Sequence, residues 1–221
     1  MSMIVVLIGP QGAGKGTQAQ MLSEKVGLPI IATGEILRKV AEEDTPIGHE
    51  VRDIQKSGNL VPDEILAQIV RDRIGLADCD GGCILDGFPR TLPQARLLEE
   101  LATGRGNRIV AVEISVPRDM LWKRLAGRRT CAVCGATYNV YLKPSKVDGA
   151  CNLDRGALVI RDDDRPEAIE QRLALYDEKT KPLLEYYKLS GRLHVVDGTG
   201  NPVDVFSRLI GVLGMTGIAR G

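Results

Sequence analysis

The sequence lacks an excess of charge of either sign, a long apolar run and any tandem repeat. Lys plus Arg number 29 and Asp plus Glu also number 29 among 221 residues. No overall positive field therefore attracts nucleic acid, and any anion-binding site must be built locally. No apolar run approaches the roughly 18 residues that a membrane span needs. The first residues, MSMIVVLIG, are typical of a short strand entering a glycine loop rather than of a signal peptide. These absences predict a cytoplasmic protein without a nucleic-acid or membrane partner.

Cysteine is also scarce, with five residues in the chain. An odd number of cysteines in a chain without an export signal favours metal binding or free thiols over a disulfide framework. Cys79 and Cys83 stand apart from the other three and are expected to be small buried hydrophobic residues. The composition, 43% hydrophobic and 26% charged, fits an α/β protein with one main core and small inserts.

Apolar runs alternate with helical stretches along most of the chain. The run MIVVLIG is followed by a glycine turn, and then Ala19, Leu22 and Val26 recur at helical spacing up to Gly27. Further short apolar runs near 82–88, 108–116 and 192–198 alternate with helical patterns near 63–74, 91–103, 118–126, 166–187 and 202–213. The alternation predicts an α/β fold with a parallel sheet covered by helices.

The segment GPQGAGKGT, residues 9–17, lies between the first apolar run and the first helical stretch. It fits the phosphate-binding P-loop pattern, except that Gly16 stands where Ser or Thr usually follows the lysine and Thr17 comes one residue later. Its glycines allow backbone N–H groups to surround phosphate oxygens, Lys15 reaches the outer phosphates, and the helix N-terminus adds partial positive charge. A glycine turn that only packs is the alternative. The strand before it and the helix after it favour phosphate binding.

Two charged residues in ILDGFPR, residues 84–90, extend this chemistry. Asp86 is expected at the carboxyl end of a strand, where it can hold the waters of a bound magnesium ion, although a carboxylate there could also cap the next helix. Arg90 offers a planar, bidentate cation suited to a second phosphate. The two residues therefore indicate a site that handles two phosphate groups.

Residues 127–164 interrupt the alternation and contain four candidate metal ligands. Cys131 and Cys134 are separated by two residues, and Cys151 and Asp154 repeat this spacing after 16 intervening residues. Two such pairs brought together form a tetrahedral site suited to Zn²⁺, with no open position and hence a structural role. A degenerate site with free thiols is the alternative. An insert of this length is too short to bury a core, which a metal can replace.

Several motifs in compatible order resemble those of the adenylate kinase family, over essentially the whole chain apart from the last ten or so residues. They are GPQGAGKGT, ATGEILR, GNLVPDEI, DGFPRTLPQA and RLAGRR. The resemblance implies a P-loop three-layer α/β fold with a mobile segment that binds the nucleoside monophosphate (NMP) and a small zinc-stabilised lid. It implies a monomer that converts MgATP and AMP into two ADP, with Mg²⁺ as cofactor. The family includes lids that hold zinc with cysteines plus either cysteine or aspartate.

The resemblance also assigns binding roles to individual residues. The residues expected to bind ATP are Gly12, Ala13, Gly14, Lys15, Gly16, Thr17, Arg128, Thr137, Tyr138 and Gly200. Those expected to bind AMP are Thr33, Gly34, Arg38, Asn59, Leu60, Val61, Gly87, Phe88, Pro89, Arg90, Gln94, Arg161 and Arg172. The amide of Gln94 has both a donor and an acceptor, and it is expected to read the edge of the adenine.

A set of cations is expected to surround the transferring phosphoryl group, with Asp86 holding magnesium through water. The set is Lys15, Arg90, Arg124, Arg128, Arg161 and Arg172. Because negative charge spreads over three oxygens in phosphoryl transfer, positioned cations carry the rate and no base is needed. The expected domains are a core of residues 1–31, 62–126 and 165–221, an NMP-binding segment of 32–61, and a lid of 127–164. The lid is expected to hold zinc with Cys131, Cys134, Cys151 and Asp154.

Two other functions remain open at this point. A kinase for another nucleoside monophosphate is disfavoured by Gln94 and by the segment ATGEILR. A P-loop switch, or a nucleic-acid-binding zinc ribbon that hydrolyses nucleotide to change partners, belongs to a different class. The balanced charge and the absence of a basic aromatic stripe around the cysteine pairs count against that class.

Overall fold

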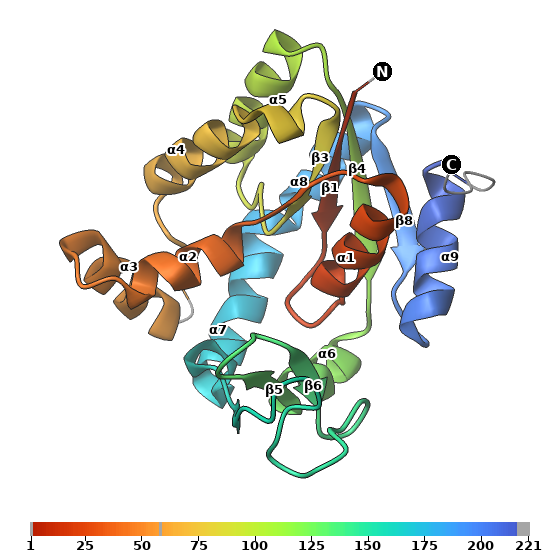
Figure 1. Ribbon diagram of the computed structural model, residues 1–221. Helices are drawn as coiled ribbons and strands as arrows, with labels where there is room; N and C mark the ends of the chain where they lie inside the picture. The colour runs from red at the N-terminus through yellow and green to blue at the C-terminus, as the bar shows by residue number, and fades with distance from the viewer. Residues whose placement is uncertain (1, 58, 216–221) are drawn as a thin grey trace.

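A five-stranded parallel sheet forms the centre of the protein (Figure 1). The computed structural model describes residues 2–57 and 59–215. Residues 1, 58 and 216–221, which belong to the core and NMP-binding ranges expected from the sequence, lie outside the described residues. The strand order is β2-β3-β1-β4-β8, and each neighbouring pair is parallel. The strands are β1 (Met3–Ile8), β2 (Ile30–Ala32), β3 (Gly82–Asp86), β4 (Arg108–Ser115) and β8 (Leu193–Asp197).

Helices cover both faces of this sheet. Along β1, Ile4, Val6 and Ile8 belong to one buried cluster and Val5 and Leu7 to another, because successive strand side chains point to opposite faces. The first cluster includes residues of α2 (Thr33–Glu42), α3 (Pro46–Lys56), α4 (Asp63–Ile74), α5 (Leu92–Gly104) and α8 (Pro182–Leu189). The second includes residues of α1 (Lys15–Val26), α6 (Arg118–Ala126), α7 (Pro166–Leu175) and α9 (Pro202–Val212). The predicted three-layer α/β fold is confirmed.

Several helix ends follow from local sequence. The side chains of Thr45, Thr91 and Asn201 accept hydrogen bonds from backbone N–H groups at the starts of α3, α5 and α9. Each of these helices has proline at its first or second position. The helical pattern over 166–187, in contrast, is not one helix. A π-helical turn (Tyr176–Thr180) separates α7 from α8. Pro182 lacks the N–H that would continue the α-helical ladder and its ring crowds the preceding turn, so a wider turn lies there.

The insert forms a separate antiparallel sheet with the strand order β6-β5-β7. Its strands are β5 (Arg128–Cys131), β6 (Thr137–Asn139) and β7 (Leu158–Val159), and a 3₁₀ turn, η2 (Asp162–Asp164), leads back to the core. Cys131, Tyr138 and Cys151 form its small buried cluster. In Figure 1 the insert lies beyond the carboxyl ends of the parallel strands. It therefore faces the edge of the sheet where parallel α/β proteins bind ligands.

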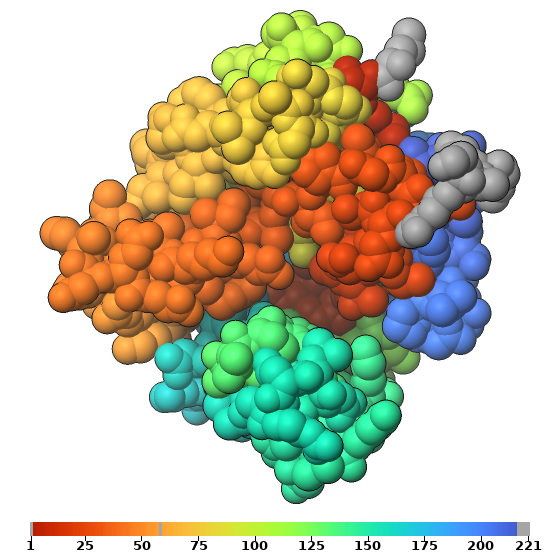
Figure 2. Space-filling view, viewed as in Figure 1, coloured from red at the N-terminus to blue at the C-terminus, as the bar shows by residue number. Residues whose placement is uncertain are grey.

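Helices α2 and α3 form an arm that projects to one side of the core (Figure 1). The space-filling view shows a hollow between this arm, the insert and α1 (Figure 2). Cys79, in the 3₁₀ turn η1 (Ala77–Cys79), and Cys83, in β3, are both buried as expected. Within residues 2–57 and 59–215, no helix has the length and apolar character that crossing a membrane requires.

Candidate active site and metal centre

The P-loop runs from the end of β1 into α1, and two of its glycines lie close against neighbouring atoms. A Cβ atom at Gly9 would lie 2.8 Å from the backbone oxygen of Ile114, and one at Gly12 would lie 3.1 Å from Cγ of Leu125. Gly14, with a φ of 99°, is the left-handed N-cap of α1, and no side chain caps the first turn of this helix. The N–H groups of that turn are therefore left for a bound anion.

Lys15 folds back on the P-loop, where its Nζ donates to the backbone oxygens of Gly9 at 2.8 Å and Pro10 at 3.0 Å. Burial lowers the pKa of Lys15 to about 8; the Asp86 carboxylate opposes this shift and the Arg90 guanidinium adds to it. An anion beside the ammonium would favour its charged form. A phosphate bound beside Lys15 would therefore stabilise its charged form.

Asp86 lies at the carboxyl end of β3, beside the first turn of α1. Because β3 pairs with β1, this end lies next to the P-loop. Oδ2 of Asp86 would be 3.3 Å from a Cβ atom at Gly16, which places the carboxylate against the residue that follows Lys15. Mg²⁺ prefers hard oxygen ligands and keeps several of its waters. The residues present therefore fit a magnesium ion held through water.

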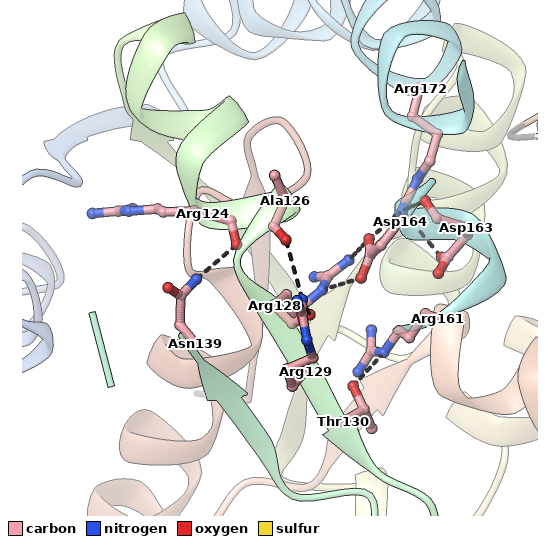
Figure 3. Close-up of polar contacts among 10 residues, drawn as sticks. All are labelled: Arg124, Ala126, Arg128, Arg129, Thr130, Asn139, Arg161, Asp163, Asp164 and Arg172. Carbon is pink, nitrogen blue, oxygen red and sulfur yellow. Dashed lines mark hydrogen bonds and ion pairs between the residues drawn. The ribbon is translucent and has the colours of Figure 1, made fainter. Parts of the chain in front are cut away.

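Three arginines of the expected catalytic set meet two aspartates where the insert joins the core (Figure 3). Nε of Arg128 donates to Oδ2 of Asp164 at 2.6 Å, and its terminal nitrogen donates to the other carboxylate oxygen. Arg172 pairs with the Asp163 carboxylate at 3.1 Å and with Asp164 at 3.4 Å. Burial lowers the pKa of Arg161 to about 10, and the charge of Arg128 lowers it further. Positive charge is therefore concentrated here and only partly balanced by the carboxylates.

The two aspartates are functional residues that the sequence motifs do not indicate. The Asp164 side chain is 0% exposed and that of Asp163 is 17% exposed. Burial opposes ionisation of Asp163, but the charges of Arg172 and Arg128 outweigh it and lower the pKa of this carboxyl. The aspartates therefore fix the arginine side chains in defined positions. The segment RDDDRPE, at the end of the insert, places three acidic residues between two arginines. This pattern is the feature of the sequence that could have indicated the two aspartates.

Arg124 contacts the P-loop and points away from the Arg128 group (Figure 3). Its guanidinium donates to the backbone oxygens of Gly12 and Ala13, both at 3.3 Å, and to that of Gly198 at 3.0 Å. Burial lowers the pKa of Arg124. Arg124 therefore braces the P-loop from α6, apart from the arginines at the base of the insert.

A cleft opens beside α2 and the loop that follows β3. The residues expected to bind AMP that line it are Thr33, Gly34, Arg38, Asn59, Leu60, Val61, Gly87, Arg90 and Arg172. Phe88, Pro89, Gln94 and Arg161 are not among its lining residues, and Phe88 and Gln94 are buried. The mixture of apolar and charged lining residues suits a nucleotide.

Arg90 links this cleft to the P-loop. Its Nε donates to the backbone oxygen of Gly87 at 2.8 Å, which fixes the guanidinium at the cleft wall. Burial lowers the pKa of Arg90 to about 10, the charge of Arg172 lowers it further, and Asp86 opposes the shift. Cations that line the cleft therefore repel one another at this point, and a polyanion would relieve that repulsion.

Three further residues expected to bind ATP lie in different parts of the structure. Thr137 is exposed on β6, and Gly200, with a φ of 92°, precedes α9. Tyr138 is buried, and its hydroxyl lies 3.3 Å from Sγ of Cys151 and accepts from the backbone N–H of Asn152 at 2.8 Å. The hydroxyl of Tyr138 thus lies within the cysteine cluster. Contacts of these three residues with ATP stay predictions.

The four predicted metal ligands lie together, with one ligand atom from each within 4.8 Å of all the others. Sγ of Cys134 is 3.7 Å from Sγ of Cys151, and Sγ of Cys131 is 3.3 Å from Oδ1 of Asp154. A tetrahedral zinc ion, with Zn–S near 2.3 Å and Zn–O near 2.0 Å, places neighbouring ligand atoms about 3.5–3.8 Å apart. The donor set and its spacing therefore fit zinc.

The two halves of this cluster have the same backbone geometry. In each, the N–H two residues after the cysteine, at Val133 or Leu153, donates to its sulfur at 3.4 Å. The N–H four residues after Cys131 or Cys151 donates to the oxygen of that cysteine at 3.1 Å in both halves. This fourth residue has a positive φ in each case: 73° at position 135 and 64° at position 155. The first half has glycine there, whereas the second has arginine.

Replacing Arg155 by glycine is expected to raise the free energy of unfolding by about 1 kcal/mol, because glycine adopts a left-handed conformation without the steric cost that arginine has. For a chain of this size the melting temperature should rise by about 2–4 °C. Thermal unfolding followed by circular dichroism measures it. The reverse change, Gly135→Ala, is expected to lower the melting temperature by a similar amount. A lower melting temperature for Arg155→Gly would contradict the assignment of strain to this residue.

Comparisons with known proteins agree with this geometry. A family model described as adenylate kinase matches residues 7–192. The chain is 48% identical to the adenylate kinase of Citrifermentans bemidjiense over 212 residues, 96% of this chain and 99% of that protein. It is 44% identical to the adenylate kinase of Agathobacter rectalis over 213 residues, 96% of this chain and 100% of that protein.

The matched range contains the P-loop, the cleft beside α2, the arginine and aspartate group and the four-ligand cluster. Of the expected site residues, Gly200 alone lies beyond the family-model match, and the relatives align over 96% of this chain. The chain therefore belongs to the adenylate kinase family, the phosphotransferases that transfer a phosphoryl group from ATP to AMP.

Proposed function

We propose that MgATP binds on the P-loop of this adenylate kinase, that AMP binds in the cleft lined by Arg38 and Arg90, and that the γ-phosphoryl group passes directly between them. The observation that carries the proposal is the surroundings of Lys15. Burial lowers the pKa of this P-loop lysine. The charge of Asp86 opposes the shift, and the charges of Arg90 and Arg172 add to it. Arg90 and Arg172 also line the cleft. The two nucleotide sites therefore converge on one group of charges.

In the proposed reaction a phosphate oxygen of AMP forms a bond to the γ-phosphorus of ATP while the bond to the bridging oxygen breaks, which gives two ADP. The attacking oxygen is already anionic, so no residue needs to remove a proton. Lys15, Arg128 and Arg172 stabilise the negative charge that spreads over the transferring oxygens. Asp86 would hold Mg²⁺ through water, and the ion when bound neutralises charge on the phosphates.

The proposed moving parts are the NMP-binding segment 32–61, which contains α2 and α3, and the lid 127–164, both attached to the core. The lid has its own sheet and its own small buried cluster. The contact between Arg128 and Asp164 lies where it joins the core. Closure of both parts over the nucleotides excludes water as the competing acceptor, a role for which adenylate kinase lids are a standard example.

Zinc is the proposed resident ion of the lid, held by Cys131, Cys134, Cys151 and Asp154. The donor set of three sulfurs and one carboxylate supports zinc, and four protein ligands leave no position for a substrate. The small cluster of Cys131, Tyr138 and Cys151 cannot hold a fold of this length by apolar burial alone. When bound, the ion would replace the missing core.

A steady-state assay with ATP and a panel of monophosphates tests the proposed function. AMP is expected to be a better acceptor than GMP, CMP or UMP, and ATP hydrolysis without a monophosphate is expected to be slow. Faster transfer to another monophosphate would overturn the AMP assignment, and fast hydrolysis without any acceptor would support a nucleotide-hydrolysing switch. Metal analysis of the same preparation should find about one zinc per chain. Light scattering should give the monomer mass of 24.0 kDa.

A further inference from the structure

The side-chain amide of Gln94 is hydrogen-bonded at both ends, to a donor at its oxygen and to an acceptor at its nitrogen. Its Oε1 accepts from the backbone N–H of Arg90 at 2.7 Å, and its Nε2 donates to Oδ1 of Asp63 at 2.5 Å. Gln94 is 2% exposed, so water does not replace these partners. A backbone N–H can only donate, and an ionised carboxylate can only accept. The two neighbours therefore decide which end of the amide is oxygen and which is nitrogen.

A flipped amide would be unfavourable at both ends. Its nitrogen would face the N–H of Arg90, and its oxygen would face the carboxylate of Asp63, which pairs donor with donor and acceptor with acceptor. Two buried hydrogen bonds would be lost at once, and unpaired buried polar groups are costly. The Asp63 carboxylate therefore keeps the Gln94 amide in one orientation.

Asp63 is itself held in place. It is the first residue of α4, and its second oxygen accepts from the hydroxyl of Thr91 at 2.9 Å. Thr91 is the N-cap of α5 and accepts from the backbone N–H of Gln94. Asp63 lies two residues beyond the end of the segment 32–61, whereas Gln94 lies 31 residues further along the chain. The carboxylate thus joins the base of the arm to the helix that carries Gln94.

Each hydrogen-bonded end of the Gln94 amide keeps one further hydrogen-bonding group. Oε1 has a second lone pair and Nε2 has a second hydrogen. Adenine presents an amino donor next to a ring-nitrogen acceptor, whereas guanine presents a carbonyl acceptor next to a ring N–H donor. An amide free to flip could pair with either base, but an amide held in one orientation matches only one pattern.

We propose that Asp63 is a positioning residue that makes the acceptor site selective for adenine over guanine by fixing the orientation of the Gln94 amide. The inference rests on the proposed transfer to AMP and on the role expected of Gln94, which is to read the edge of the adenine. Asp63 contacts no substrate in this scheme. It acts through Gln94, and its carboxylate is required because a neutral amide at position 63 could present either a donor or an acceptor.

Asp63→Asn is the informative variant, because it keeps the size of the side chain and removes its fixed acceptor character. Glu64→Gln is the matched control, since Glu64 is the next residue of the same helix turn, is exposed, and loses the same charge. Gln94→Leu removes the reading amide itself. The measurement is kcat/KM for AMP and for GMP, together with KM for ATP, in each variant and in the parent protein.

Asp63→Asn is expected to lower the ratio of kcat/KM for AMP to that for GMP by about tenfold, with KM for ATP unchanged. Glu64→Gln is expected to keep the parent ratio. Asp63→Ala, which also removes the acceptor, is expected to act in the same direction and serves if the asparagine variant does not fold. A role confined to folding would lower the melting temperature and leave the ratio unchanged.

Two results would overturn the inference, and they are distinguishable. If Gln94→Leu loses selectivity but the Asp63 variants retain it, Gln94 reads the base and Asp63 does not position it. If Gln94→Leu also retains selectivity, both the positioning role of Asp63 and the proposed reading role of Gln94 are wrong. In the second case transfer to AMP would be unaffected, so the proposed reaction itself would stand.

Discussion

Replacing Lys15 by alanine is expected to lower kcat by about 10³-fold, because a preorganised charge that stabilises the transferring phosphoryl group is lost. The melting temperature is expected to stay the same or to rise. Burial lowers the pKa of Lys15 to about 8, which shows that the folded protein penalises the charged form. Substitution of a residue that serves function at a cost in stability lowers activity and leaves the stability unchanged or higher. Steady-state kinetics and thermal unfolding of the same preparation measure both effects.

The pH dependence of the parent protein provides a second test of Lys15. The Lys15 amine must be protonated to bind phosphate. The value of kcat/KM for ATP should therefore be high below pH 8 and fall as the pH rises through about 8. Lys15→Arg stays charged over this range, and its weaker activity should lack the decline. Lys188→Ala, at a side chain that is 72% exposed, is the control for removal of a lysine charge. Near-normal turnover in Lys15→Ala would contradict the assignment.

The parts of the fold that the sequence predicts are those with strong local patterns. β1 is a continuous apolar run and α1 ends at a glycine, and both elements lie where the periodicity places them. β2 (Ile30–Ala32) has three residues, too few to show a period, and its pairing with β3 defines it. The separation of α7 from α8 depends on Pro182 within an otherwise helical pattern. Short elements and interrupted helices therefore need tertiary contacts to be recognised.

The candidate site likewise has parts that local sequence patterns predict and parts that depend on long-range contacts. The four predicted metal ligands lie together, and the sequence indicates them because the spacing within each pair is local and repeated. The contact between Asp63 and Gln94 spans 31 residues, and no local pattern in the sequence indicates it. The burial of Asp164 against Arg128 likewise depends on how the insert joins the core. Spacing thus predicts which residues form a site, whereas the partners that orient those residues come from long-range packing.

Replacing Cys131 by serine is expected to lower the melting temperature by about 10 °C or more, because binding of a structural metal contributes directly to the folding of a unit that has almost no core of its own. Cys131 is 2% exposed and belongs to the small buried cluster of the lid, which has only two other fully buried members, Tyr138 and Cys151. At a temperature where the lid remains folded, kcat should fall much less. Thermal unfolding, metal analysis and steady-state kinetics on one preparation separate these effects.

Two lid carboxylates provide the matched control for this prediction. Asp154→Asn replaces a ligand oxygen that lies within the cluster, whereas Asp148→Asn changes an exposed carboxylate of the same lid. The first variant is expected to lose zinc and melt earlier, and the second to behave as the parent. Removal of the metal with a chelator should lower the melting temperature of the parent and leave that of Cys131→Ser nearly unchanged. A parent protein that contains no zinc and still melts at the same temperature after chelation would show that the cluster holds the lid without a metal.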